Sequence, residues 1–272
     1  MIEEELYQLI WPYLKEPTYR VRFSAMSVAR GLSLTKAAQK LFPSMGIMAM
    51  IVSIWQELET PREMLSLTLR ILCHLSNHAP NARFYMEPQV VDILARAADD
   101  TDIDFHLTAM TTIANLCENT DFHLQIMDSS LFSCLQAQVF NEYTTVQQEI
   151  VRGMCHLSLT PKYHHAILSS GIMANIMPIA MTPSLDLTMR IQATQLFASV
   201  TATHPTTPAA QDFQDLLFLA CNAEEDMEIR RYCVMTLSNA ASDPVNNIHL
   251  LQPHAIEGRR KNIKVDKTVE IT

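Results

Sequence analysis

The chain is poor in the residues on which many catalytic loops depend. It holds 5 glycines among 272 residues, and it contains no phosphate-binding glycine loop, no G-x-S-x-G elbow and no H-E-x-x-H helix. Its apolar runs stop at about a dozen residues, too short to span a bilayer. The acidic N-terminus lacks a secretory pattern. We therefore expect a cytoplasmic protein that is not an enzyme and does not insert into a membrane.

Paired metal ligands are also missing. None of the 6 cysteines forms a C-x-x-C pair, and most lie in apolar helical patterns, which disfavours zinc and a disulfide framework. The densest set of ligand residues is Cys155, His156, His164 and His165, and Cys155 fits a buried helix face. The aspartates of residues 99–104 lack a glycine-centred calcium loop, so we interpret them as helix caps. We expect no metal and no cofactor.

Positive charge is scarce outside one segment. The net charge is −9, and residues 257–272 hold five basic and three acidic residues, which leaves −11 for residues 1–256. A body of that charge repels nucleic acid and suits a basic protein surface. We expect other proteins as partners, and neither nucleic acid nor a small-molecule substrate.

What the chain does have is a helical pattern that recurs six times. Apolar residues stand three positions before a repeated position, and mostly small residues stand seven before it, which places them on one helical face. We call the repeated positions anchors, and they recur every 40 to 43 residues, a period typical of α-solenoids. The anchors are Leu32, Leu75, Leu116, Leu157, Val200 and Ala240.

Each anchor is expected to close a long helix, which a short helix and then a second apolar helix follow. Gly46 and Gly171 precede two of the second helices, where a positive φ is needed. Thr60-Pro61-Arg62-Glu63 predicts a capping box at the start of one long helix, and Thr182-Pro183-Ser184 is expected to open another. The second helices are predicted to begin near Ile47, Val90, Leu131, Ile172 and Leu216.

This three-helix unit resembles the armadillo repeat. Residues 112–117 (TIANLC) and 236–241 (TLSNAA) are similar to the small-Leu-Ser-Asn-Leu-Ala stretch in the family's third helix, and Gly46-Ile47 and Gly171-Ile172 are similar to its turn into helix two. The resemblance implies an all-α, right-handed α-solenoid of about six three-helix repeats over residues 1–256. HEAT repeats, which use two helices, are the structural alternative.

The resemblance also implies a binding groove along the long helices. The family's import receptors carry a Trp one turn before the groove Asn, whereas the two Trp here are Trp11 and Trp55. Their peptide-binding ladder carries over only at two asparagines, and two arginines would repel a basic import signal, so we do not expect an import receptor. The positions facing the groove, which we call the groove row, are Arg70, His74, Thr111, Asn115, Arg152, His156, Gln195, Ser199, Met235 and Asn239.

The two ends of the chain differ from the repeats. Residues 3–15 form a lone apolar-faced helix that is expected to cap the first repeat. In the basic tail of residues 257–272, by contrast, residues 262–272 alternate as a strand does. We expect this basic tail to be extended and held on the protein's own surface or added as a strand to a partner. Its candidate contact residues are Arg259, Arg260, Lys261, Ile263, Val265, Lys267, Val269 and Ile271.

Taken together, these features predict a non-enzymatic scaffold for protein–protein interaction. The resemblance favours a structural subunit of a larger complex, cytoskeletal or ciliary, and a cytoplasmic location that includes the cilium. The alternative is a cargo or chaperone adaptor that binds clients transiently in the concave groove.

Overall fold

A computed structural model of the chain describes residues 2–246. The basic tail of residues 257–272, with its candidate contact residues, lies outside the described residues. The chain divides into two compact units, which we describe separately: unit 1 is residues 1–160 and unit 2 is residues 161–272. Within residues 2–246 the secondary structure is helical throughout, with no strand, and no helix there is both long and apolar enough to cross a bilayer.

The six long helices expected from the anchors are all present. Five of the six anchors are buried at the last turns of these helices, and Leu32 is partly exposed. Burial of an apolar stripe stabilises each helix far more than its intrinsic propensity does. The long helices are α2 (Tyr19–Leu32), α5 (Arg62–Ser76), α8 (Ile103–Cys117), α11 (Thr144–Leu157), α14 (Leu187–Thr201) and α16 (Met227–Ala240).

Shorter helices connect the long ones. The second helices are α4 (Ile47–Gln56), α7 (Pro88–Ala98), α10 (Ser130–Ala137), α13 (Met173–Ala180) and α15 (Ala210–Cys221). The short helices are α3 (Lys36–Leu41), η1 (Ala79–Asn81) with α6 (Ala82–Tyr85), η2 (Thr120–Phe122) with α9 (His123–Met127), and η3 (Pro161–Tyr163) with α12 (His164–Ser169).

Four of the second helices begin within two residues of the predicted positions. Gly46 and Gly171 have φ angles of 91° and 81°, so the expected need for glycine before two of them is confirmed. The fifth start was wrong, because α15 begins at Ala210 and not near Leu216. No short helix forms in residues 202–209, where Pro205 and Pro208 lack the N–H groups that a helix needs.

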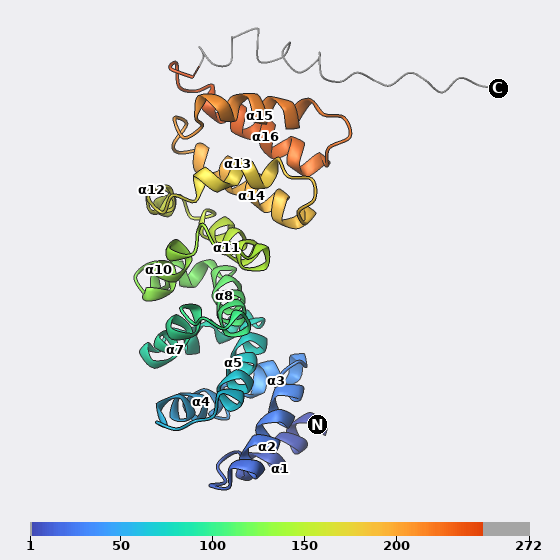
Figure 1. The fold of residues 1–272 in the computed structure, drawn as a ribbon, viewed down its shortest axis with the longest axis vertical. Coiled ribbons are helices and arrows are strands. Elements are labelled where there is room, and N and C mark those ends of the chain that lie inside the picture. Colours follow the sequence, from blue (N-terminus) through green and yellow to red (C-terminus); the bar gives the residue numbers. More distant parts are fainter. Residues whose placement is uncertain (1, 247–272) are drawn as a thin grey trace, which may run out of the picture. The chain divides into compact units, whose positions relative to one another are not determined.

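In unit 1 the helices form two rows. The long helices α2, α5, α8 and α11 pack each against the next, and α4, α7 and α10 form a second row beside them (Figure 1). Between the rows lies a continuous apolar core, in which Leu72, Ile93 and Ile113 are almost fully buried. In unit 2, α14 packs against α13 and α16, and α16 also packs against α15.

Two of the predicted helix starts were wrong in detail. The Thr60 hydroxyl donates to the Ile54 carbonyl, 2.8 Å away, and does not cap α5, which follows Pro61 directly. The fifth long helix is capped by Asp186, whose carboxylate accepts from the Met189 N–H at 3.1 Å, and not by the Thr182–Ser184 segment. Asp186 lies nearer the start of α14 than the predicted segment does, and its negative charge also interacts favourably with the positive end of the helix dipole.

The first helix, α1 (Ile2–Leu14), packs against α2 and α3 and buries Tyr7 and Leu14 completely. Its other side is not the polar surface expected of a cap. Leu9 is 67 % exposed and Tyr13 is 54 % exposed. The helix therefore covers the inner side of the first repeat and presents apolar side chains outward.

Candidate protein-binding surface

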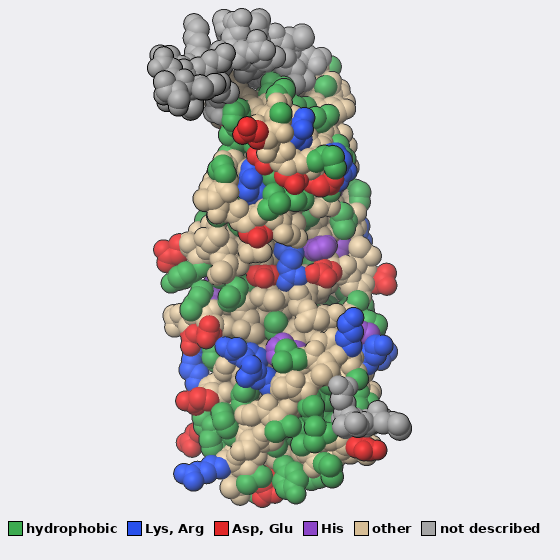
Figure 2. All heavy atoms as spheres, turned by 90° about the vertical axis from the view of Figure 1, so that its right-hand side faces the viewer, with side chains coloured by type: hydrophobic (Ala, Val, Ile, Leu, Met, Phe, Trp, Pro, Cys, Tyr) green, Lys and Arg blue, Asp and Glu red, His purple; other side chains and the backbone are tan. Residues whose placement is uncertain are grey.

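All ten residues of the groove row lie on the long helices, as the sequence predicts, and each is at least partly exposed. Six belong to unit 1 and lie on α5, α8 and α11, and four belong to unit 2 and lie on α14 and α16. In the view of Figure 2, basic and acidic side chains lie close together with apolar patches between them. The row is therefore accessible, and its chemistry depends on what each polar group already contacts.

In unit 1 two side chains of the row tie neighbouring repeats together. The Asn115 amide donates to Ser76 Oγ at 2.8 Å and to Asn77 Oδ1 at 3.2 Å, both at the end of α5. His74 Nδ1 lies 2.7 Å from Ser33 Oγ at the end of α2. The family resemblance assigns Asn115 to a peptide-binding ladder, but both of its amide hydrogens are donated to groups within the protein. Its carbonyl oxygen is the group left for a partner.

Arg152 is held by its own protein. Its guanidinium contacts Glu149 on α11 at 2.5 Å, Glu118 after α8 at 2.6 Å and the Thr111 carbonyl at 3.3 Å. Its side chain is only 18 % exposed, so the three groups form one partly buried network with a local charge of −1. Such a network orders the row across two repeats, and Arg152 does not present a free positive charge.

Arg70 is the more available cation. Its guanidinium lies 3.5 Å from the Asp104 carboxylate, and the two side chains are 41 % and 70 % exposed. An exposed pair at this distance contributes little to stability and can exchange partners. Both arginines have acidic neighbours that compensate their charge. The expectation that they would repel a basic segment therefore does not hold in unit 1.

The pKa values of the two histidines of the row are both lowered, which favours their uncharged forms at neutral pH. Burial, reinforced by the nearby charge of Arg30, lowers the pKa of His74 below its ordinary value. Burial also lowers the pKa of His156, against the opposing charge of Glu118. The histidines therefore act in the row as neutral hydrogen-bonding groups.

In unit 2 the row is less polar. The Asn239 amide donates to the Ala198 carbonyl at 3.1 Å and to Thr201 Oγ1 at 3.4 Å, which repeats the role of Asn115. Met235 is 42 % exposed, and Arg231 lies 3.9 Å from its sulfur. Gln195 and Ser199 complete this part of the row on α14.

Sequence reasoning missed a second set of ties between repeats. The residue ten positions before the anchor is an arginine in three repeats, and in two of them it pairs with a carboxylate just before the next long helix. Arg22 binds Glu57 with two hydrogen bonds of 2.9 Å, and Arg190 binds Glu225 at 2.7 Å. The recurrence of Arg at this position is the signal that could have identified these pairs.

Sequence reasoning also missed a buried polar residue that follows most long helices. Each such side chain bonds a main-chain carbonyl six residues earlier, at or just beyond the end of the long helix. Buried carbonyls of this kind need a donor, because an unpaired one costs about 1–3 kcal/mol. The pairs are Gln39 with Ser33 at 3.2 Å, Asn81 with Leu75 at 2.8 Å, His123 with Cys117 at 2.7 Å, and Asn246 with Ala240 at 2.9 Å.

The cysteine and histidine cluster singled out in the sequence has structural contacts. Cys155 is 3 % exposed in α11, and His164 is buried with its Nδ1 2.5 Å from Thr203 Oγ1. Within residues 2–246 no three His, Cys, Asp or Glu side chains are placed to hold a metal ion. In the acidic turn, Asp102 caps α8 through the Asp104 N–H at 2.9 Å, as interpreted from the sequence.

No family model matches the sequence, and no curated protein matches it. Solved structures do match the fold. A computationally designed armadillo repeat protein for modular peptide recognition is 13 % identical, with 86 % of this chain and 99 % of that one covered and a TM-score of 0.72. A designed armadillo repeat protein in complex with the peptide (KR)4 is 13 % identical over 87 % of this chain and 99 % of that one, with a TM-score of 0.71.

A structure from work on a phosphorylation switch that controls the interaction between cadherin and β-catenin is also similar. It has a TM-score of 0.76 and 15 % identity, and the match covers 97 % of this chain but 50 % of that one. At these identities the likeness concerns the fold alone. The chain folds as an armadillo-like α-solenoid, as the resemblance in its sequence implies.

Proposed function

We propose that the protein is a scaffold that binds other proteins along the groove row and does not catalyse a reaction. The observation that carries this proposal is the row itself: ten accessible, mostly polar side chains on long helices whose other sides are buried. A row held in place by bonds between repeats is preorganised, so little conformational entropy is lost when a partner binds.

The charge of the body indicates the kind of partner. Residues 1–256 carry −11, and the arginines of the row in unit 1 are compensated by carboxylates. An extended basic segment of another protein would complement this surface. The designed armadillo protein with a bound (KR)4 peptide is a fold-level precedent for such a ligand.

The finer parts of the proposal follow from the family resemblance. We place the protein as a subunit of a larger cytoplasmic assembly, cytoskeletal or ciliary, with the tail of residues 257–272 as a second contact. In that role the protein would hold its partner in a stable stoichiometric complex, whereas a cargo or chaperone adaptor would release its client readily.

A selection from a random peptide library on the intact protein tests the proposed surface. Arg70→Ala with Thr111→Ala changes two accessible residues of the row, and we expect the selected peptides to lose about tenfold in affinity. The matched control is Asp92→Ala with Arg96→Ala, which removes an exposed ion pair from α7 in the other row of helices. Equal affinities for both variants, or a loss with the α7 variant alone, would contradict the proposal.

A further inference from the structure

Successive long helices meet through two defined faces. A Cβ built on Gly153, four positions before its anchor, would lie 3.6 Å from the Cα of Ala114 in the preceding repeat. Thr112, at the same position one repeat earlier, lies near Cys73 of the repeat before it and lowers the pKa of that thiol, against the larger effect of burial. We call the positions eleven and four before the anchor the leading face, and the positions six before and one after it the trailing face.

In the five long helices after α2 the leading face is buried. Five residues at the eleventh position before the anchor and four at the fourth are at most 4 % exposed, and these are Met64, Phe105, Val146, Met189 and Ile229, and Ile71, Thr112, Leu196 and Thr236. In the first repeat the same two positions hold Val21 and Val28, which are 38 % and 42 % exposed.

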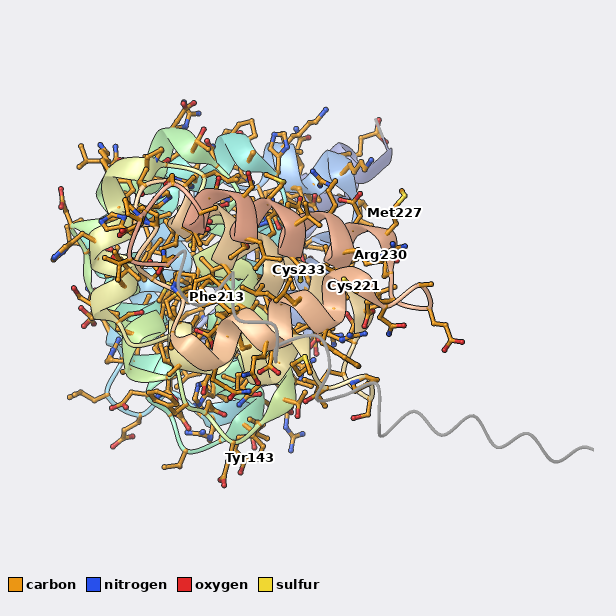
Figure 3. The ribbon with its side chains drawn as sticks, turned by 90° about the horizontal axis from the view of Figure 1, so that it is seen from above. Tyr143, Phe213, Cys221, Met227, Arg230 and Cys233 are labelled. Carbon is orange, nitrogen blue, oxygen red and sulfur yellow. The ribbon has the colours of Figure 1, made fainter. Side chains whose placement is uncertain are left out.

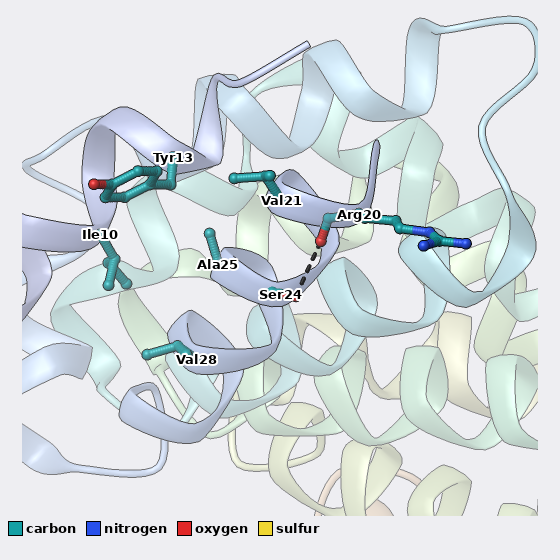
Figure 4. A pocket seen from close by; sticks show the side chains of 7 residues that line it. All are labelled: Ile10, Tyr13, Arg20, Val21, Ser24, Ala25 and Val28. Carbon is teal, nitrogen blue, oxygen red and sulfur yellow. Dashed lines mark hydrogen bonds between the residues drawn. The ribbon is translucent and has the colours of Figure 1, made fainter. Parts of the chain in front are cut away.

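The exposed leading face of α2 borders a groove. Ile10 and Tyr13 of α1 line its other side, and its volume is about 420 Å³ (Figure 4). Val21, Ala25 and Val28 lie along one face of α2 in this view. The leading face of α2 is thus an exposed apolar surface among the described residues, whereas the same face is buried in the other described long helices.

The trailing face shows the complementary difference at the other end. Six positions before the anchor, Met26, Leu69, Met110 and Thr194 are at most 1 % exposed, whereas Val234 on α16 is 54 % exposed. One position after the anchor, Ser33, Ser76, Cys117 and Thr201 are buried, whereas Ala241 is exposed. Figure 3 looks onto α15 and α16, where these positions lie.

A charged pair accompanies the apolar faces. Arg22 and Arg190 each bind a carboxylate just before the next long helix, Glu57 and Glu225 respectively. Arg230 stands at the same position of the last long helix, at the end of α16 that also carries Met227 (Figure 3). Its Nε donates to the Ala220 carbonyl at 3.3 Å, and it forms no ion pair within residues 2–246.

The start of the same chain offers the matching carboxylate. Glu16 lies between α1 and α2, just as Glu57 lies between α4 and α5, and Glu225 between α15 and α16. It forms no ion pair with the described residues either. A second copy of the chain therefore supplies both an apolar leading face and an acidic group at the position that Arg230 needs.

We propose that two copies associate head to tail: the leading face of α2 in one copy packs on the trailing face of α16 in the next, and Arg230 pairs with Glu16 across the interface. Such a contact continues the repeat-to-repeat packing of the chain into a second molecule. Because it joins different faces, it does not close after two copies, and assemblies grow with concentration.

Sedimentation of the intact chain at increasing concentration tests the proposal. We expect the mean mass to rise, and Val28→Glu or Val234→Glu alone to hold the protein as a monomer. Both positions are exposed, so the variants should fold. An equimolar mixture of the two variants keeps one intact leading face and one intact trailing face, and it should form a discrete dimer.

The control is Leu58→Glu, at a fully exposed leucine outside both faces, which should associate like the original chain. Arg230→Glu and Glu16→Arg should each weaken association about tenfold, and their combination in one chain should restore it.

Three outcomes would overturn the proposal. The first is an intact chain that stays monomeric throughout. The second is a Val234→Glu variant that still dimerises, because that result means that like faces pair. The third is association that begins only after residues 247–272 are deleted, because that segment is then the occupant of the trailing face.

Discussion

An arginine–glutamate ion pair recurs at the same repeat position in each of the two units, but the two pairs differ in burial and therefore in their contribution to stability. Arg22–Glu57 in unit 1 and Arg190–Glu225 in unit 2 join residues of the same type, 35 positions apart. The first pair is 19 % and 39 % exposed, whereas the second is 7 % and 10 % exposed. The first is a surface contact, and the second is part of the core of unit 2, so the same repeat position has two different energetic roles.

The largest predicted difference comes from breaking these two pairs. Arg190→Ala leaves the Glu225 carboxylate buried without its cation and should reduce the free energy of unfolding by about 3–5 kcal/mol. Arg22→Ala should cost at most about 1 kcal/mol, because Glu57 is partly solvated. Urea unfolding of the full chain measures both changes, and losses of equal size would remove the distinction between the two units. The double variant Arg190→Leu with Glu225→Leu should recover most of the lost stability.

The next effect compares a buried amide with an exposed one beyond the same helix. Asn81 donates to the carbonyls of Leu75 and Gln39, both at 2.8 Å, and is 3 % exposed. Asn81→Ala should cost about 2 kcal/mol, because both acceptors remain buried. Asn77 is exposed, and Asn77→Ala should cost less, about 0.5–1 kcal/mol, because it removes one accessible hydrogen bond from Asn115 and leaves no acceptor buried. A comparison of their urea midpoints tests this, and an equal effect would show that burial does not set the cost.

Two glycines should respond to the same substitution with opposite signs. Gly46 has φ 91°, so Gly46→Ala should lower the free energy of unfolding by about 1 kcal/mol or more. Gly31 lies in α2 with no atom within 4 Å of an added Cβ, so Gly31→Ala should raise it by up to about 1 kcal/mol. Thermal unfolding of the two variants gives the signs. A gain in stability for Gly46→Ala would contradict the left-handed turn into α4.

The smallest effect concerns reactivity and leaves stability unchanged. Burial raises the pKa of the Cys117 and Cys233 thiols to about 12, so almost no thiolate forms there near pH 8, whereas Cys221 is exposed. Cys221 should react with a thiol reagent much faster than the other two, because the reagent can reach it. Mass spectrometry after brief labelling checks this order, and early modification of Cys117 would contradict the packing of α8.

The anchors predicted the six long helices because apolar periodicity reports directly which helix face is buried. The helix starts were harder. Thr60 and Asp186 are both good capping types, and only the local chain path decides which donor is within reach. The short helix expected after α14 is absent because of two prolines. A prediction that extends the repeat pattern to every copy does not take their effect into account.

For the candidate surface, spacing placed the row on the right helices but gave no information on its bonds. The partners of Asn115, and the Glu118 and Thr111 partners of Arg152, lie 34 to 41 positions away in the chain, so only the folded structure brings them together. The exposure of Val28 and Val234 was equally hidden, because a side chain at a repeat position looks the same in sequence whether or not a neighbour covers it.

The central claim is that partners bind along the long helices, and hydrogen exchange with and without the tightest selected peptide tests it most directly. We predict slower exchange in α5, α8 and α11 when the peptide is bound, with no change in α4, α7 and α10. Protection confined to the second helices would contradict the account.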